Sequence, residues 1–242
     1  MLKNDFYAAV DALYSKIRAT QDKTIEQAAE LIADRVSKGG AVNLFDTGHL
    51  IDSELLNRAG GLVLYRRFRY GLNVENDVRP RDMSGKEKSM QGLAEYALRA
   101  SQMLPGDVLI IGSVSGKTMN VIDLAIEAKK MGIAVVTLSS FEYSSKLESA
   151  HSSKLHLYEI GDVNIDNCAP FGDGMLPVDA FEAKLIPASG LAAAYIMWAL
   201  TAELTERLIA KGIVPSALKS VNFPENVEYN NKLYERYKNE GI

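Results

Sequence analysis

The feature that most constrains the fold is the continuous apolar run at 108–111 (VLII), which lies between a Pro-Gly turn and a loop rich in serine and glycine. An apolar run without alternation is typical of a strand buried on both faces of a parallel sheet. A second such run, at 134–138, follows a segment with helical spacing. Because parallel strands need a long crossover between them, usually a helix, the chain is predicted to contain a strand–helix–strand unit.

Apolar runs and helical segments alternate along most of the chain. Two more apolar runs, at 41–45 and 62–68, precede the central unit, and a further strand is expected at 155–158. Strands that alternate with helices predict a doubly wound α/β fold. The spacing of apolar residues predicts helices in two N-terminal segments that divide near Thr24, and at about 51–59, 91–103, 189–211 and 225–238.

The chain is long enough for one large domain or two small ones. No linker, internal repeat or low-complexity tract divides the sequence. We therefore expect a single domain, 1–242, with N-terminal helices in 1–38, the sheet core in 39–162 and a helical part in 163–242. Residues 69–90 are rich in Gly, Asn, Pro and charges and predict a long irregular segment, of a kind that is often functional.

Charge and composition exclude several classes of partner. The net charge of -4 provides no basic face for a nucleic-acid backbone. The single cysteine, Cys168, cannot form a disulfide framework within the chain. The most apolar stretch, 191–200, is shorter than the roughly 20 residues that a membrane span needs, and the N-terminus lacks the apolar core of a secretion signal. We expect a cytoplasmic protein that binds neither nucleic acid nor membrane.

The loop 112–118 (GSVSGKT) carries residue types suited to a phosphate group. Ser113, Ser115 and Thr118 supply hydroxyls, and Gly112 and Gly116 let the backbone pass close to a ligand. The helix that begins after the loop presents unpaired N–H groups and its positive dipole end. A simple helix cap is the alternative interpretation of the same residues.

The loop also ends like a nucleotide P-loop, in Gly-Lys-Thr. That motif needs four residues between its glycines, whereas Gly112 and Gly116 enclose three. Nucleotide binding is therefore not expected.

Two neighbouring turns offer further polar groups, because ligands of open α/β sheets lie beyond the carboxyl ends of the strands. After the first strand, Thr47 and Gly48 are placed to contact a ligand, and His49 is a candidate acid or base near neutral pH. The alternative is that Thr47 caps the next helix and His49 has no chemical role. After the strand at 134–138, two serines precede Glu142, in a serine-rich stretch that also fits a solvated loop.

These motifs resemble those of the sugar isomerase (SIS) domain family. The resemblance rests on the turn Asp46-Thr47-Gly48-His49 and on the segments 106–118 and 125–138. An uncharacterised, phosphoheptose-isomerase-like branch of the family is similar over more of the chain, in the segments 45–49, 58–62, 166–173 and 187–190.

The resemblance implies a five-stranded parallel sheet flanked by helices, with additional N- and C-terminal helices. It also implies a small sugar phosphate as ligand and a homodimer or homotetramer with sites near subunit interfaces. We expect no cofactor. The phosphosugar contacts that we expect are Thr47, Gly48, Ser113, Ser115, Gly116, Thr118 and Ser189.

The chain departs from this branch at two places. The branch commonly has Ser-His after the Gly-His pair, where this chain has Leu50 and Ile51. Near the C-terminus an Asp-Glu-His-Asn pattern is replaced by Val227-Glu228-Tyr229-Asn230. Two polar side chains and a histidine that would be candidates for chemistry are therefore missing here.

The expected activity is an aldose–ketose isomerase of carbohydrate derivatives, which needs a base beside the carbonyl and an acid to move protons between oxygens. The candidates are Glu142, which follows a strand end; Glu54, which is otherwise an exposed helical glutamate; His49; and Glu228, which would reach a site from a neighbouring subunit. The alternative function is a non-catalytic phosphosugar sensor or regulatory subunit.

Metal-dependent chemistry is the third option. His151 and His156 are five residues apart and form no HExxH arrangement, and the chain has only three histidines. We therefore expect no metal, although some phosphoheptose isomerases of this fold use zinc, so zinc stays an alternative.

Overall fold

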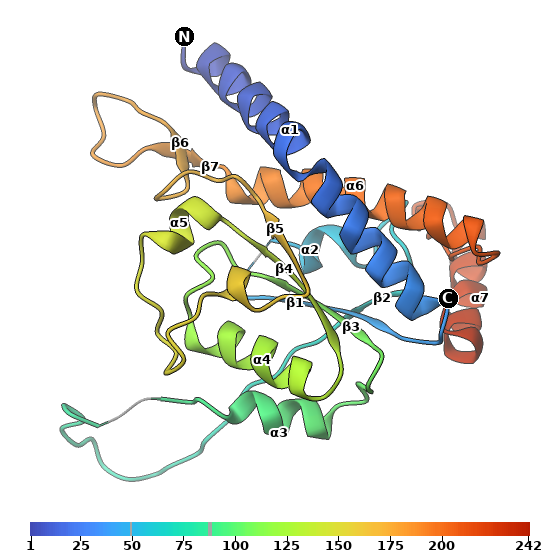
Figure 1. The fold of residues 1–242 in the computed structure, drawn as a ribbon, viewed down its shortest axis with the longest axis horizontal. Coiled ribbons are helices and arrows are strands. Elements are labelled where there is room, and N and C mark those ends of the chain that lie inside the picture. The colour runs from blue at the N-terminus through green and yellow to red at the C-terminus, as the bar shows by residue number, and fades with distance from the viewer. Residues whose placement is uncertain (49, 87–88) are drawn as a thin grey trace.

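The computed structural model describes residues 1–48, 50–86 and 89–242. A five-stranded parallel sheet with the strand order β2-β1-β3-β4-β5 lies at its centre, between layers of helices (Figure 1). The predicted doubly wound α/β fold with a five-stranded parallel sheet is confirmed. The strands are β1 (Val42–Asp46), β2 (Tyr65–Arg67), β3 (Val108–Gly112), β4 (Ala134–Ser139) and β5 (Val163–Asp166).

Helices cover both faces of the sheet. Figure 1 shows the two long helices α1 (Leu2–Val36) and α6 (Ser189–Ala210) on one face, and α3 (Leu93–Ala100) and α4 (Met119–Lys130) on the other. The remaining helices are α2 (Asp52–Leu55), α5 (Phe141–Ser145), a 3-10 helix (Leu157–Glu159) and α7 (Glu225–Glu240), and a separate antiparallel pair comprises β6 (Gly174–Leu176) and β7 (Leu185–Pro187).

The central strand explains why the core has two halves. Successive side chains of a strand point to opposite faces, so Val108 and Ile110 pack with α1 and α6, whereas Leu109 and Ile111 pack with α3 and α4. All four side chains are fully buried. A strand with apolar residues at every position is stable only where both faces are covered, as the uninterrupted apolar run predicted.

The N-terminal segment forms one helix, so the prediction of two helices divided near Thr24 is wrong. No glycine or proline interrupts the segment between residues 2 and 36. Ile17, Ile25 and Ile32 are buried on one continuous face of α1, which packs along α6. Because the helix is supported by tertiary contacts along this length, a local capping signal does not end it.

The predicted strand at 155–158 is also wrong, since Leu157 begins a 3-10 helix. The fifth strand is β5, whose residues Val163 and Ile165 alternate with Asn164 and Asp166. The predicted helix at 51–59 is limited to the four residues of α2, and the β6–β7 pair was not expected.

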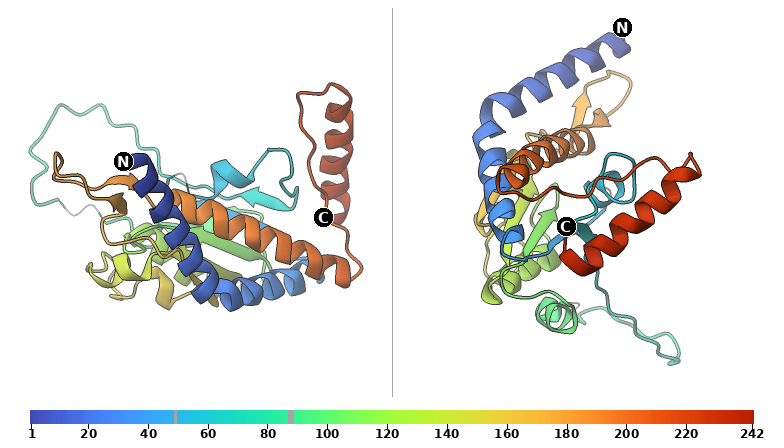
Figure 2. Two further views of the ribbon diagram at one scale, coloured as in Figure 1. Left: turned by 90° about the horizontal axis from the view of Figure 1, so that it is seen from above. Right: turned by 90° about the vertical axis from the view of Figure 1, so that its right-hand side faces the viewer.

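The segment after β2 is irregular, as predicted. Residues 71–86 are exposed, and the described part of the chain between β2 and α3 contains no helix or strand. Both views in Figure 2 show this segment standing away from the body. None of the described helices is long and apolar enough to cross a membrane.

Candidate functional site

The candidate site lies where the strand order reverses. From β1 the chain continues outward to β2, whereas from β3 it continues in the other direction to β4 and β5. The last residues of β1 and β3, Asp46 and Gly112, are register partners, and the N–H of Thr47 donates to the Gly112 carbonyl oxygen at 3.4 Å. The turn at 47–48 and the loop 112–118 therefore leave the sheet together, at the position where open α/β sheets bind ligands.

Backbone hydrogen bonds hold the loop 112–118 against its surroundings. The N–H of Ser113 donates to Leu138 O at 3.0 Å, and the Val114 carbonyl accepts from Ser140 N at 2.9 Å. Further along, the carbonyls of Gly116 and Lys117 accept from Leu157 N at 2.9 Å and Ala150 N at 3.0 Å. The loop is thus fixed before any ligand arrives, which lowers the entropic cost of binding.

The predicted hydroxyl groups of the loop differ in exposure. Ser113 is only 2% exposed, whereas Ser115 is half-buried and Thr118 is exposed. Thr118 is the residue that precedes α4, but its side chain makes no capping hydrogen bond. The hydroxyls of Ser115 and Thr118 therefore remain accessible to a ligand, beside the N–H groups that begin α4.

The backbone conformation and the surroundings of Gly116 both disfavour a side chain at this position. Its φ is +54°, and a Cβ placed there would lie 3.1 Å from Leu157 Cβ and 3.3 Å from Ser144 Oγ. Both the backbone conformation and the space therefore favour glycine. Its role is to let the loop lie close to the segment behind it.

Asp46, which the sequence analysis did not single out, shapes the turn after β1. Its Oδ2 accepts from the N–H groups of Ile51 at 2.8 Å and Asp52 at 3.0 Å, and its Oδ1 accepts from Gly48 N at 3.0 Å. Asp46 thus satisfies the beginning of α2, a role that one alternative gave to Thr47. Thr47 is exposed, and the predicted His49 lies outside the described residues.

The two apolar residues that depart from the branch pattern belong to the core. Leu50 is 4% exposed and Ile51 is fully buried. A Cβ at Gly112 would lie 3.5 Å from Ile51 Cδ1, so Ile51 packs directly under the end of β3. At this turn, two buried apolar side chains therefore stand where the branch commonly has the polar pair Ser-His.

The three described glutamate candidates all have partners. Glu54 Oε1 accepts from the indole Nε1 of Trp198 at 3.0 Å, and its other oxygen pairs with Arg58. Glu142 pairs with Lys146 at 2.9 Å, and this hydrogen bond holds the pKa of the Glu142 carboxyl below its usual range.

Glu228 is likewise paired, with Lys232 at 2.8 Å, and its pKa is lowered by that bond. Glu228 lies in the first turn of α7. In Figures 1 and 2 this helix is at the opposite end of the molecule from α5, the helix that contains Glu142. The structure therefore does not bring Glu228 and Glu142 together within one chain.

Ser189 has a partner within the protein. Its hydroxyl donates to Asp173 Oδ2 at 2.8 Å, its N–H donates to Asp173 Oδ1 at 2.8 Å, and the residue is 1% exposed. This arrangement satisfies the beginning of α6. A ligand contact for Ser189 stays a prediction.

The two described histidines are engaged in different local contacts. His151 Nδ1 lies 2.8 Å from Ser153 Oγ, and its Nε2 lies 3.6 Å from Asp123 Oδ1. His156 Nδ1 lies 3.2 Å from Glu159 Oε2. Over the ranges that the structure describes, no three His, Cys, Asp or Glu side chains are grouped so that they could hold a metal ion.

Comparison with known proteins agrees with this architecture. Residues 5–140 match the profile of a family described as SIS domain. A UPF0309 protein of Streptomyces coelicolor is 33% identical over 95% of this chain and 92% of its own length.

Two solved structures share the fold at low identity. The phosphoheptose isomerase GmhA from Neisseria gonorrhoeae is 16% identical with a TM-score of 0.52, over 85% of this chain and all of that one. The NanR protein of Vibrio vulnificus, complexed with ManNAc-6P, is 19% identical with a TM-score of 0.50, over 98% of this chain and 67% of that one. Together with the match over residues 5–140, the sequence identity to the UPF0309 protein shows that this chain belongs to the SIS domain family.

Proposed function

We propose that the protein binds a small sugar phosphate and interconverts its aldose and ketose forms, with the phosphate held by the loop 112–118. The observation that carries this proposal is the position of Ser115 and Thr118 on the loop that follows β3, next to the turn that follows β1, with no capping bond from the Thr118 side chain. Hydroxyl donors, backbone N–H groups and the positive end of α4 together suit a phosphate dianion.

Similar proteins support the ligand class. One structure of this fold is a phosphoheptose isomerase and another holds ManNAc-6P. Both ligands implied by these names are phosphorylated sugars. The predicted contacts Thr47, Gly48, Ser113 and Gly116 lie on the two segments that follow the ends of β1 and β3.

The isomerisation itself needs a base that removes the proton from the carbon next to the carbonyl and returns it to the neighbouring carbon. We propose Glu142 for this role, because the turn that carries it is bonded to the phosphate loop through Ser140 N and Val114 O at 2.9 Å. The hydrogen bond to Lys146 lowers the pKa of Glu142 and so weakens it as a base, which means that this bond must open before the carboxylate accepts the proton. Lys146, its present partner, would stabilise the negative charge that develops on the sugar oxygen.

Proton exchange tests this activity. In deuterated water, an isomerase incorporates deuterium at the carbon next to the carbonyl, which proton NMR detects for each member of a panel of aldose and ketose phosphates. We expect exchange in the wild-type protein and its loss in Glu142→Gln or, if Glu54 is the base, in Glu54→Gln. Glu95→Gln is the matched control, since Glu95 also pairs with a cation four residues later.

A sensor without catalysis is the second candidate function. Glu142 and Glu228 both form surface ion pairs with a lysine four residues later, an arrangement that does not require a catalytic role. The chain also shares its fold with NanR, whose structure is a complex with ManNAc-6P. A sensor predicts that a sugar phosphate raises the melting temperature although no exchange occurs on that ligand.

We further propose that the protein is a homodimer or homotetramer. The first turns of α1 extend beyond the body beside the β6–β7 pair (Figure 1). Apolar side chains are exposed on both, among them Leu2, Tyr7, Phe181 and Ile186. Burial of these side chains in a subunit interface is favourable, at roughly 25 cal/mol per Å². Light scattering coupled to gel filtration measures the subunit number, and a monomer at micromolar concentration would contradict the proposal.

In such an oligomer, Glu228 could reach a site of the neighbouring subunit, as the sequence analysis expected. A cytoplasmic location and the absence of nucleic-acid and membrane partners stay predictions from the sequence.

A further inference from the structure

Residues 71–86, between β2 and α3, form an open loop in which every residue is exposed. Its described hydrogen bonds join residues no more than three positions apart, and none of them reaches the rest of the described chain. Four large apolar side chains of this loop are between 46% and 68% exposed, namely Leu72, Val74, Val78 and Met83. Long loops without regular structure are uncommon in compact domains, and active-site lids are among their known uses. The open loop therefore exposes apolar surface that only another conformation or a partner would bury.

Both flanks of the open loop are attached beside the candidate site. Before the loop, the hydroxyl of Tyr70 donates to the Asn120 carbonyl oxygen at 3.2 Å. After it, Ser89 Oγ lies 3.4 Å from Met119 Sδ. Met119 and Asn120 are the first two residues of α4, which begins directly after the phosphate loop (112–118). The open loop therefore leaves and rejoins the body at the rim of the proposed phosphate site.

The two flanks are held more firmly than the open loop itself. The Tyr70 ring stacks on Phe45 near the end of β1, with 5.7 Å between the ring centroids. Beyond Ser89, the buried carboxylate of Asp123 in α4 accepts from Gly92 N at 2.8 Å. A loop with fixed ends moves through changes of backbone angle at a few positions near those ends. The open loop therefore has the build of a lid that is hinged at the candidate site.

The open loop is long enough to cover the phosphate loop. An extended chain spans about 3.3–3.6 Å per residue, so a loop of sixteen residues that goes out and returns reaches roughly 25 Å from its flanks. Ser115 lies four residues before Met119, and so no more than about 15 Å from that point of attachment. Figure 2 shows the open loop standing away from the body, so closure is a movement of this loop towards the phosphate loop.

The charges of the two loops favour closure on an anion. Arg79 and Arg81 lie in the middle of the open loop, and neither forms an ion pair or hydrogen bond with another described residue. Asp82, the acid next to them in the sequence, bonds to Ser84 instead. On the phosphate loop, the N–H groups of residues 114–118 have no acceptor in the described chain. Positive groups on the two loops repel each other without an anion, whereas a phosphate dianion between them attracts both, and guanidinium groups match phosphate oxygens well.

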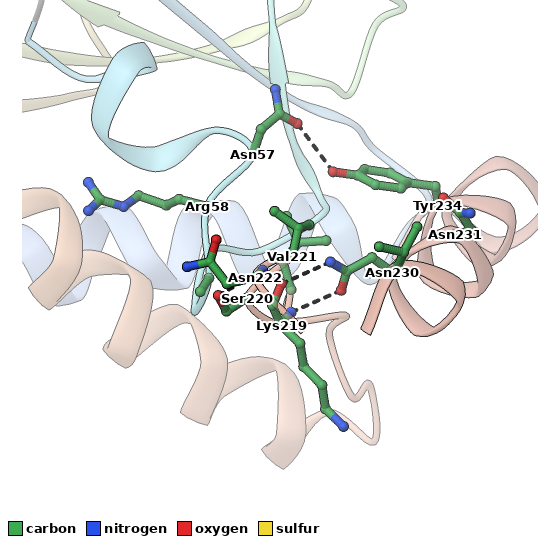
Figure 3. A pocket seen from close by; sticks show the side chains of 12 residues that line it. Asn57, Arg58, Lys219, Ser220, Val221, Asn222, Asn230, Asn231 and Tyr234 are labelled. Carbon is green, nitrogen blue, oxygen red and sulfur yellow. Dashed lines mark hydrogen bonds between the residues drawn. The ribbon is translucent and has the colours of Figure 1, made fainter. Parts of the chain in front are cut away.

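Several other cations of the chain are engaged elsewhere. Arg67 and Arg69, which precede the open loop, both pair with the buried Asp52, at 3.0 and 2.6 Å. The pocket of about 400 Å³ between the segment after α2 and α7 provides no competing anion site, because the side chains of Arg58 and Lys219 point away from it (Figure 3). The two arginines of the open loop have no such engagement within the described residues.

We propose that the open loop closes over the phosphate loop when a sugar phosphate binds, and that Arg79 and Arg81 then contact the phosphate. In the closed state the apolar side chains of the open loop cover the sugar and exclude water from the reacting carbons. This inference rests on the proposed function, because it assigns further contacts to the same ligand.

Hydrogen–deuterium exchange measures the closure. The backbone N–H groups of the open loop form few hydrogen bonds, so peptides from residues 72–86 should exchange rapidly without ligand. A member of the aldose and ketose phosphate panel that raises the melting temperature, such as glucose 6-phosphate, should slow this exchange at least about tenfold at saturation. Glucose should leave it unchanged. The exposed residues 221–224 are the internal control and should exchange at the same rate with and without ligand.

A double variant tests the arginine contacts. Arg79→Gln/Arg81→Gln changes two exposed positions, so the melting temperature without ligand should stay the same, whereas Kd for the sugar phosphate should rise at least about tenfold. Lys23→Gln/Lys38→Gln is the matched control, because it removes the same charge at exposed positions in and just after α1, the helix on the other face of the sheet from α4. This control should change Kd by less than about twofold.

Each outcome bears on a different part of the proposal. If a sugar phosphate raises the melting temperature but the peptides from 72–86 exchange as before, closure is overturned and phosphosugar binding stands. If Arg79→Gln/Arg81→Gln binds as tightly as the wild type, the arginine contacts are overturned. Protection that rises with protein concentration and not with ligand would show that the open loop meets a second subunit instead. If no member of the panel raises the melting temperature, the proposed function fails, and closure on a phosphosugar fails with it.

Discussion

Leu157 closes the rear of the loop 112–118: its N–H donates to the Gly116 carbonyl at 2.9 Å, and its Cβ would lie 3.1 Å from a Cβ at position 116. Because these two residues are forty-one positions apart, the loop depends on a contact that no local pattern specifies.

This contact predicts the effect of Gly116→Ala. The new Cβ meets both a crowded space and a positive φ, so we expect a loss of about 1–3 kcal/mol in unfolding free energy and a loss of stabilisation by sugar phosphates. Gly212→Ala is the matched control, since Gly212 also has a positive φ but no atom within 4 Å of the added Cβ. Urea unfolding with and without ligand measures both effects. If Gly116→Ala and Gly212→Ala lose the same unfolding free energy, steric crowding at position 116 does not contribute.

Phosphate binding by the loop predicts the behaviour of Ser115→Ala/Thr118→Ala. Without ligand, the melting temperature should change little, because the Thr118 side chain makes no capping hydrogen bond. Sugar phosphates should raise the melting temperature of the wild type but no longer that of the variant, and the parent sugars should raise neither. A variant that retains the full ligand-induced shift would place the phosphate elsewhere.

Ser189→Ala separates a structural role from a ligand contact. Loss of the hydrogen bond to Asp173 Oδ2 removes one partner from a half-buried carboxylate, so we expect destabilisation of about 1–3 kcal/mol. If the serine serves only α6, the shift in melting temperature caused by sugar phosphates stays at its wild-type size. A smaller ligand-induced shift, in a variant that is fully folded before heating, would instead support the predicted phosphosugar contact.

Tyr65 predicts a loss of stability at alkaline pH. Burial raises its pKa from 10.0 to about 12, despite the hydrogen bond to Thr201. Tyr65 therefore ionises at a lower pH in the unfolded chain than in the folded protein. Below about pH 10 the tyrosine is neutral in both states and its contribution to the unfolding free energy is complete. As the pH rises from about 10 to about 12, the unfolded chain loses the proton first, and the unfolding free energy falls by up to roughly 1.4 kcal/mol per pH unit.

Tyr65→Phe should flatten this part of the stability profile, at a cost of about 1 kcal/mol at neutral pH from the lost hydrogen bond to Thr201. Tyr96→Phe, at an exposed position, is the control. An unchanged slope between about pH 10 and 12 in the Tyr65 variant would show that this tyrosine does not ionise on unfolding.

Much of the fold was predictable because it depends on local patterns. The runs at 41–45, 108–111 and 134–138 predicted the parallel strands β1, β3 and β4, and the helical spacing at 189–211 predicted α6. The position of the loop 112–118 at a strand end followed from the same patterns. These features depend on residues within a few positions of one another, so the sequence by itself determined them.

Only the tertiary structure decided the features that join distant segments. It showed that α1 is one helix, because α6 supports its length, and that β5 is the fifth strand, because β4 offers it an edge. It also assigned the Ser189 hydroxyl to Asp173 and placed Trp198 against Glu54, which lies 144 positions away. The physical reason is that buried polar groups must find hydrogen-bond partners in space, and which partners are near is set by the packing of the whole chain.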